Sequence, residues 1–166
     1  MMVGGICYGW QARAIDPVDD KDRMRNNTGY GRGTLLMFAD RLSSARYAVI
    51  GEGPVDAIKF DRVGGNVASM GKVVTARQLQ EILKFPIEAL YLALDDDAAD
   101  EMTELAKQVE IPVYRLLVPQ TCIDRCRISG KKPDFGECTF EECEQAFNNP
   151  IKVDLFYLML HLKEWK

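Results

Sequence analysis

Residues 89–97 read Ala-Leu-Tyr-Leu-Ala-Leu-Asp-Asp-Asp, and this stretch decides the fold. Mostly apolar residues run directly into three carboxylates, and residues 98–109 then follow a helical pattern. An apolar run of this length, followed by a helix, is typical of a strand buried on both faces of a parallel sheet. The three acids therefore come at the carboxyl end of that strand, where open α/β sheets bind their ligands.

The three adjacent carboxylates indicate a cation site, because such close like charges repel one another unless a divalent ion keeps them ionised. In an extended backbone Asp95 and Asp97 point the same way, whereas Asp96 points to the opposite side. Asp95 and Asp97 are thus the favoured ligand pair. The alternative is that Asp96 or Asp97 only caps the following helix, with Asp100 and Glu101 near its positive end. The local sequence leaves both interpretations open.

The rest of the central sequence alternates strands with helices. We predict strands over residues 46–52, 66–70, 89–94 and 113–118. Helices are expected between them: from Pro54 to about Val63, from Thr75 to the stop at Phe85-Pro86, and over residues 98–109. Pro54 suits a first helical position, and Thr75 with Gln78 fits a capping box. This order, with short links, predicts an α/β fold with a parallel four-stranded sheet flanked by helices.

The two flanks of this region have patterns of their own. Residues 3–15 alternate well enough for a strand or hairpin, and residues 16–33 read as an exposed polar loop. After the last strand we expect a long polar loop, a helix capped by Thr139 and a final amphipathic helix, over residues 120–134, 139–147 and 151–165. His161, the sole histidine, is expected to be a partly buried structural residue of this final helix.

The composition excludes several classes of protein. The chain has 166 residues and a net charge of −4, which suits one domain of ordinary size. It has no apolar run long enough to cross a membrane and no leader-like start, so we expect a cytoplasmic protein. It also lacks a P-loop and a Ser-His-Asp or Cys-His arrangement. Its acidity argues against nucleic-acid binding, but that argument weakens where acids hold metal ions.

The cysteines are expected to be free thiols. Their odd number, five, and the lack of a secretion signal argue against a disulfide framework. The last four, Cys122, Cys126, Cys138 and Cys143, follow C-x3-C-x11-C-x4-C, which is not the spacing typical of zinc sites. We therefore expect ordinary buried or reduced thiols, with a structural zinc as the alternative.

Two acidic strand ends in one sheet can converge into a single site. Glu52 ends a predicted strand, Asp56 lies one helical turn later, and Asp95 and Asp97 end another strand. Oxygen ligands select Mg²⁺ or Mn²⁺, and zinc would find no histidine partner here. A magnesium site of this kind suits phosphoryl chemistry, because the metal neutralises phosphate oxygens and steadies a pyrophosphate leaving group.

These acids sit in a recognisable signature. The segments Glu52-Gly53-Pro54-Val55-Asp56-Ala57 and Asp95-Asp96-Asp97 closely resemble the Toprim signature, E-G-x-x-D followed by D-x-D. The Toprim domain is shared by DnaG-type primases, topoisomerases, small nucleases and recombination-repair proteins. The spacing and the intervening order of strands and helices also fit this family.

Further segments are similar to DnaG-type primases, bacterial or from bacteriophages. Asn66-Val67-Ala68-Ser69-Met70-Gly71 is similar to the primase "ASLG" segment, and Lys132-Pro133-Asp134 resembles K-D-P-D-E. Asp134 matches the second acid of that segment, whereas Lys132 stands near the position of the first. Upstream, residues 9–15, 22–26 and 31–35 resemble the G-F-x-G-R, P-K-Y-x-N and K-G-R-x-L-Y-G segments of primases. The likeness extends to about residue 147.

The resemblance implies a Mg²⁺- or Mn²⁺-dependent DNA primase that makes RNA primers on single-stranded DNA from ribonucleoside triphosphates. Its catalytic residues would be Glu52, Asp56, Asp95 and Asp97, and its metal ligands Glu52, Asp95, Asp97 and Asp134. Template or nucleotide would be bound by Arg23, Asn26, Arg32 and Lys72. The implied units are a lead-in segment, a Toprim catalytic domain and a C-terminal helical segment, over residues 1–45, 46–136 and 137–166.

The same resemblance implies partners and rivals. A replicative helicase and a zinc-ribbon template reader would be supplied by another chain, in the host cytoplasm if the protein is phage-encoded. A Toprim nuclease or a non-catalytic replication module are the alternatives. The primase interpretation requires the acidic strand ends to lie side by side, and a neighbouring lysine that blocked the cation would count against it.

Overall fold

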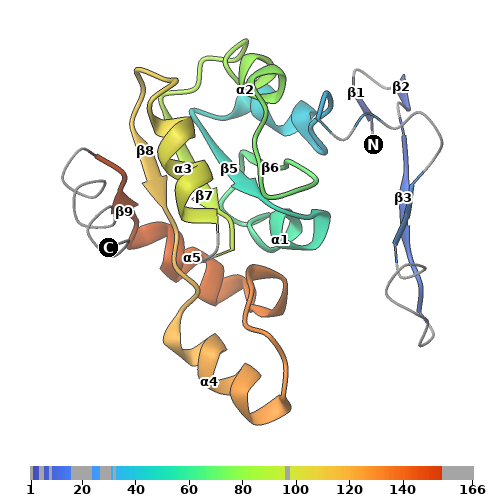
Figure 1. Ribbon diagram of the computed structural model, residues 1–166, viewed down its shortest axis with the longest axis vertical. Coiled ribbons are helices and arrows are strands. Elements are labelled where there is room, and N and C mark those ends of the chain that lie inside the picture. The colour runs from blue at the N-terminus through green and yellow to red at the C-terminus, as the bar shows by residue number, and fades with distance from the viewer. Residues whose placement is uncertain are drawn as a thin grey trace.

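A central sheet of five strands organises the protein, for which a computed structural model describes residues 2–3, 6–7, 9–15, 24–26, 31, 33–95 and 98–154. The strand order is β6 (Asn66–Ala68), β5 (Tyr47–Gly51), β7 (Ala89–Ala93), β8 (Val113–Arg115) and β9 (Ile151–Lys152). The first four strands are parallel, and β9 pairs antiparallel with β8 at the edge. The apolar run before the acids thus forms a strand, as predicted, and this strand, β7, is the central one of the sheet (Figure 1).

Helices connect the four parallel strands in the predicted alternation, and two further helices lie between β8 and β9. The helices are α1 (Pro54–Lys59), α2 (Ala76–Ile82), α3 (Ala99–Ala106), α4 (Gln120–Ser129) and α5 (Phe140–Asn148), with 3-10 helices η2 (Ala39–Ser44) and η4 (Phe135–Glu137). Both predicted capping boxes are present, since Thr75 accepts from the Gln78 N–H and Thr139 accepts from the Glu142 N–H. Several elements end earlier than predicted; α1, for example, stops at Lys59.

Alternating side chains of β5 and β7 contribute to two separate cores. Ala48, Ile50, Leu90 and Leu92 face a core that includes residues of α2 and α3. Val49 and Ala93 face the opposite core, which includes residues from α4, η4 and α5, together with Phe60, the C-cap of α1. The result is a three-layer α/β/α arrangement, in which the second core carries the segments after β8. Burial on both faces explains why β5 and β7 read as nearly continuous apolar runs.

The N-terminal part forms two small antiparallel pairs beside the α/β body (Figure 1). β1 (Met2–Val3) pairs with β2 (Ile6–Cys7), and β3 (Gln11–Arg13) pairs with β4 (Met24–Asn26). The predicted strand or hairpin over residues 3–15 therefore forms, but its second pair reaches into the segment predicted as a loop. Within the described residues, no helix is long and apolar enough to cross a membrane.

Two predictions after β8 are wrong. Residues 120–134 do not form a long loop, because α4 occupies Gln120–Ser129 and ends at Gly130 in a left-handed conformation. Cys122 and Cys126, one turn apart, form the buried face of α4. Because most other residues of the helix are polar, its sequence shows no clear amphipathic pattern. Residues 151–152 form β9 instead of starting a helix, because they pair with Tyr114 and Arg115 at the sheet edge. His161 and the rest of the predicted final helix lie outside the described residues.

Candidate functional site

Glu52 and Asp56 lie together where β5 passes into α1. Glu52 follows the last strand residue, Gly51, and Asp56 is the third residue of α1. The Asp56 carboxylate accepts a hydrogen bond from the Gly53 N–H at 2.8 Å, which closes the first turn of the helix. A Cβ on Gly51 would come within 2.9 Å of the Ala57 nitrogen, so only glycine allows this tight turn. The turn thus places both acids at the carboxyl end of the sheet.

Asp134 reaches the same place from the segment before η4. Its Oδ1 accepts a hydrogen bond from the Glu137 N–H at 2.9 Å, which caps η4. A Cβ on Gly136 would lie 3.0 Å from Asp56 Oδ1 and 3.2 Å from Asp134 Oδ1. Both carboxylates therefore face the Gly136 backbone, and the missing side chain leaves room for them. The structure thus brings together two of the predicted site acids that lie far apart in the sequence.

Burial and the neighbouring acids change the pKa of Asp56. The pKa of Asp56 is raised from 3.8 to about 6, mainly by burial and also by the carboxylates of Asp134 and Asp95, although the backbone N–H donors of Gly53 and Gly136 act to lower it. Asp95, which follows β7, is therefore close enough to act on Asp56 electrostatically. The ends of β5 and β7 lie side by side, as the primase interpretation requires, because these two strands are paired along their full length.

Lys132 also enters this site, where it forms an ion pair with Asp95. Its side chain is 69% exposed, against 26% for Asp95, so the ammonium lies at the rim and remains in contact with water. Exposed pairs of this kind contribute little, typically less than about 1 kcal/mol. The lysine therefore competes with a cation for Asp95 but does not close the site.

Two hollows in the surface adjoin this group of residues. One, of about 490 Å³, is polar and is lined by Val55, Asp56, Lys131, Lys132, Asp134, Gly136 and Glu137. The other, of about 380 Å³, is more apolar and includes Leu94, Asp95, Leu116, Lys132 and Phe135. Lys132 lines both. The acids are thus reachable from outside, beside an apolar surface that could accept a base or sugar.

The loop after β6 borders Glu52 and is held by buried polar groups. The Gly71 N–H donates to the Glu52 carbonyl oxygen, and the Ser69 N–H and hydroxyl both donate to the Gly51 carbonyl oxygen. Gln78 is fully buried, and its side-chain amide donates to the carbonyl oxygens of Leu35 and Ser69. The segment similar to "ASLG" therefore supports the end of β5, and exposed Lys72 comes directly after it.

The structure leaves part of the predicted site undescribed. Arg23, Arg32 and Asp97 lie outside the described residues, and of Asn26 only the backbone, paired with Gln11 in β3, is described. The N-cap of α3 is Ala98, which makes no side-chain capping bond. Sequence reasoning missed Gly136 and the Lys132 ion pair. The glycine two residues after Asp134 was the only available signal for the first.

The acids could together hold a divalent cation that keeps several of its waters. Mg²⁺ in phosphoryl-transfer sites is held by one or two carboxylates, with water and substrate filling the other positions. Asp56, Asp95 and Asp134 offer only oxygen, and their mutual repulsion would be relieved by a cation. Among the described residues no three acids lie within 4.8 Å of one another, so the arrangement suits a hydrated ion better than a tight cage.

Asp56→Asn is expected to stabilise the metal-free protein by roughly 1–3 kcal/mol near pH 8 and to lose this gain as the pH falls from about 6 to below about 4. The pKa of Asp56 is about 6 when folded, above its usual 3.8. The folded state therefore holds the proton more tightly than the unfolded state, and stability falls as the pH rises through 6. Asparagine removes this cost but keeps an acceptor for the Gly53 N–H. Thermal unfolding of both proteins across this pH range, with a chelator present, measures the difference; a pH-independent difference would contradict it.

Solved DNA primases share this fold. A DNA primase domain from Pseudomonas aeruginosa matches with a TM-score of 0.68 at 17% identity, over 96% of this chain and 52% of that one. The Aquifex aeolicus primase, in its zinc-binding and RNA polymerase domains, matches with 0.64 at 20% identity, over 90% and 38%. A DnaG catalytic core matches with 0.60 at 19% identity, over 89% and 50%.

These likenesses establish a primase-type fold, since the identities are too low to carry more. The chain spans between 38% and 52% of the length of these structures. No protein-family model matches the sequence, and no curated protein matches it.

Proposed function

We propose that this chain is the catalytic part of a DNA primase, which joins ribonucleotides on a single-stranded DNA template with the help of Mg²⁺ or Mn²⁺. The observation that carries the proposal is the meeting of Asp56, Asp95 and Asp134 at the carboxyl end of a sheet with a primase-type fold. The Toprim-like order of Glu52, Asp56 and Asp95 along the sequence supports it independently of the fold.

We assign each acid of the site a role according to its position. Asp95 and Asp97, with Glu52 and Asp134, would hold the metal, and Asp56 would support them through its bond to the Gly53 N–H. A bound Mg²⁺ supplies charge neutralisation at the phosphates and a lower pKa for the attacking 3′-hydroxyl. Glu52, on the strand end itself, is suited either to bind that metal or to accept the hydroxyl proton.

Basic and polar residues outside the acidic site would bind the template and the nucleotide. Arg23, Asn26 and Arg32 in the lead-in segment, and Lys72 beside Glu52, would contact phosphates, for which guanidinium groups are suited. We further propose that a helicase and a zinc-ribbon template reader act with this chain, since one of the similar primases is described with a zinc-binding domain beside its RNA polymerase domain.

The test is incubation of the protein with unlabelled single-stranded DNA, labelled ribonucleoside triphosphates and Mg²⁺. We expect short labelled RNA products that disappear on chelation. A parallel reaction with labelled DNA and no nucleotides separates the rival activity, because a nuclease would shorten the DNA. DNA cleavage without synthesis would replace the proposal with a nuclease, and DNA binding without either reaction would favour a non-catalytic module.

Lys132→Ala is expected to lower the Mg²⁺ concentration needed for half-maximal activity by roughly two- to five-fold, the range expected for an exposed ion pair. The lysine ammonium occupies an oxygen of Asp95 that a cation would otherwise attract. Activity titrated against Mg²⁺ measures the change. Lys107→Ala is the matched control, since Lys107 forms an exposed pair with Glu104 on α3 and should leave the titration unchanged. An increased Mg²⁺ requirement in Lys132→Ala would show that the lysine assists the reaction.

A further inference from the structure

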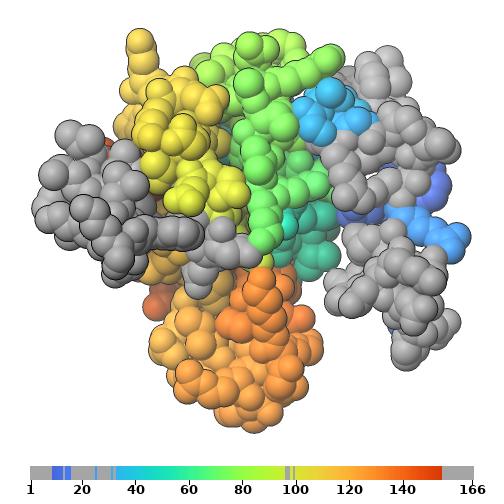
Figure 2. All heavy atoms as spheres, viewed as in Figure 1, coloured from blue at the N-terminus to red at the C-terminus, as the bar shows by residue number. Residues whose placement is uncertain are grey.

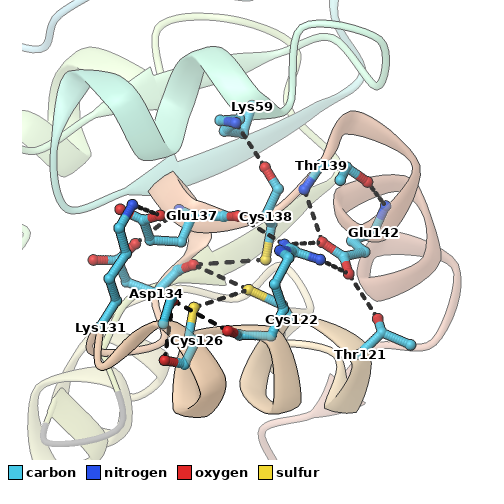
Figure 3. A network of polar contacts seen from close by, with 12 residues as sticks. Lys59, Thr121, Cys122, Cys126, Lys131, Asp134, Glu137, Cys138, Thr139 and Glu142 are labelled. Carbon is cyan, nitrogen blue, oxygen red and sulfur yellow. Dashed lines mark hydrogen bonds and ion pairs between the residues drawn. The ribbon is translucent and has the colours of Figure 1, made fainter.

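Four cysteines that are scattered in the sequence meet in the core below the sheet. Cys122 and Cys126 lie on α4, Cys138 comes directly after η4, and Cys143 lies on α5; all four are buried and reduced. α4 and the segment that follows it, orange in Figure 2, form a lobe at the bottom of the view. Figure 3 shows the sulfurs of the first three cysteines grouped between α4 and the segment from Asp134 to Cys138. Spacing in the sequence alone does not predict this meeting.

Cys122 lies within reach of two other cysteine sulfurs. Cys122 Sγ lies 3.9 Å from Cys126 Sγ, and the Cys122 and Cys138 sulfurs lie within 4.8 Å of each other. Cys143 lies in the same buried core. Among the described residues, the three ligand atoms that all lie within 4.8 Å of one another are those of Cys122, Cys138 and Glu142, so the Cys126 and Cys143 thiols would have to turn toward this point to complete a tetrahedron. In a tetrahedral site with zinc–sulfur bonds of about 2.3 Å, neighbouring sulfurs are about 3.8 Å apart. Cysteines four residues apart on α4 supply one edge of such a tetrahedron.

We propose that Cys122, Cys126, Cys138 and Cys143 bind a structural zinc ion that joins α4, η4 and α5. Thiolate ligands select zinc over the hard cations that carboxylates prefer, so this site would not compete for magnesium. Each thiol that binds the metal gives up its proton to solvent, and no oxidant or reductant is needed. Arg125 and Lys131 lie within electrostatic reach of Cys126, and each also pairs with a glutamate, Glu142 and Glu137 respectively.

Glu142 is the competing fourth ligand, because its carboxylate also lies within 4.8 Å of the Cys122 and Cys138 sulfurs. Both of its oxygens are already engaged. Oε1 accepts from the Thr121 hydroxyl at 2.7 Å and from Arg125, and Oε2 accepts from Arg125 and from the Thr139 N–H, each at 2.8 Å. A metal would have to break these bonds to take the carboxylate. Cys143, which is fully buried in the same core, is therefore assigned the fourth position.

The zinc would brace one wall of the candidate active site. The Asp134 carbonyl oxygen lies 3.6 Å from Cys138 Sγ and 3.9 Å from Cys122 Sγ, while the Asp134 side chain faces the hollow with Asp56. Lys59 of α1 also donates to the Cys138 carbonyl oxygen at 2.7 Å. The cysteine cluster thus lies directly behind the segment that carries Asp134. This inference concerns the stability of that segment and holds whether the chain is a primase or a nuclease.

The test is the metal content of the full chain, purified without chelators from cells grown with added zinc. We expect about one zinc ion per chain and X-ray absorption showing four sulfur neighbours at about 2.3 Å. Replacement with Co²⁺ should give thiolate-to-cobalt charge-transfer and tetrahedral d–d bands. Cys122→Ser should lose the zinc, whereas Cys7→Ser, at the one cysteine outside the cluster, should keep it. Hydrogen exchange of residues 131–138 should become faster when the zinc is removed.

The measurements on the unaltered chain decide the matter even where a cysteine variant fails to fold. A zinc-free protein whose cysteines all react as free thiols would overturn the site. Bound iron in place of zinc would overturn the assignment of the metal. Three sulfurs and one oxygen around the zinc would overturn the choice of Cys143 over Glu142. None of these readouts depends on primer synthesis, so failure of the zinc site and failure of the proposed function are distinguishable.

Discussion

Glu52→Gln and Asp95→Asn are each expected to reduce Mg²⁺-dependent primer synthesis by roughly 100-fold or more, the scale on which loss of a catalytic acid or base acts. Each change removes a negative charge at the end of a strand while preserving the size of the side chain. Glu52 and Asp95 lie just beyond β5 and β7, which pair residue by residue, so both charges belong to one place on the sheet. Synthesis at saturating nucleotide, with folding checked by circular dichroism, measures the effect.

Glu88→Gln is the matched control for these two variants. Glu88 precedes β7 at the opposite end of the same strand, where its carboxylate pairs with Arg46 on the surface. Breaking that exposed pair should cost less than about 1 kcal/mol and leave synthesis unchanged. Normal synthesis by folded Glu52→Gln or Asp95→Asn would remove the acids from the mechanism, and with them the primase proposal.

Local sequence patterns were enough to predict the parallel sheet and the acids at the ends of β5 and β7. The apolar runs of β5 and β7 are buried on both faces, so their sequences carry a strong signal for strands in a parallel sheet. Parallel pairing then places the residues at the carboxyl ends of both strands on the same edge, which is how Glu52 and Asp95 could be placed near each other from the sequence. The capping boxes at Thr75 and Thr139 were readable because their bonds span only three residues.

The parts that were mispredicted depend on contacts between distant residues. β9 is a strand only because it meets β8, and its short sequence, Ile151-Lys152, has no pattern of its own. α4 has a weak apolar pattern, because cysteines and not aliphatic residues make its buried face. The ion pair between Lys132 and Asp95 joins residues 37 positions apart, and no local rule anticipates it.

Asp134 and Asp56 are also far apart in the sequence, and they are brought together by packing in the hydrophobic core. The ring of Phe60, at the end of α1, lies 5.3 Å from the ring of Phe135, the residue directly after Asp134. Phe60 is fully buried and Phe135 is nearly so, in the core that the cysteines share. Packing between these two rings therefore holds the Asp134 segment against α1, on which Asp56 lies.

Phe60→Ala is accordingly expected to destabilise the protein by about 3–5 kcal/mol, the usual cost of removing a buried ring and leaving a cavity. The loss should be accompanied by weaker Mg²⁺ binding, because the segment with Asp134 would lose its contact with α1. Urea unfolding gives the free energy, and the Mg²⁺ dependence of synthesis gives the second effect. Ile128→Ala on α4, where Ile128 is 89% exposed, should change stability by no more than about 0.5 kcal/mol. A loss of under about 1 kcal/mol for Phe60→Ala would mean that the cavity collapses without cost, and that another contact holds Asp134 in place.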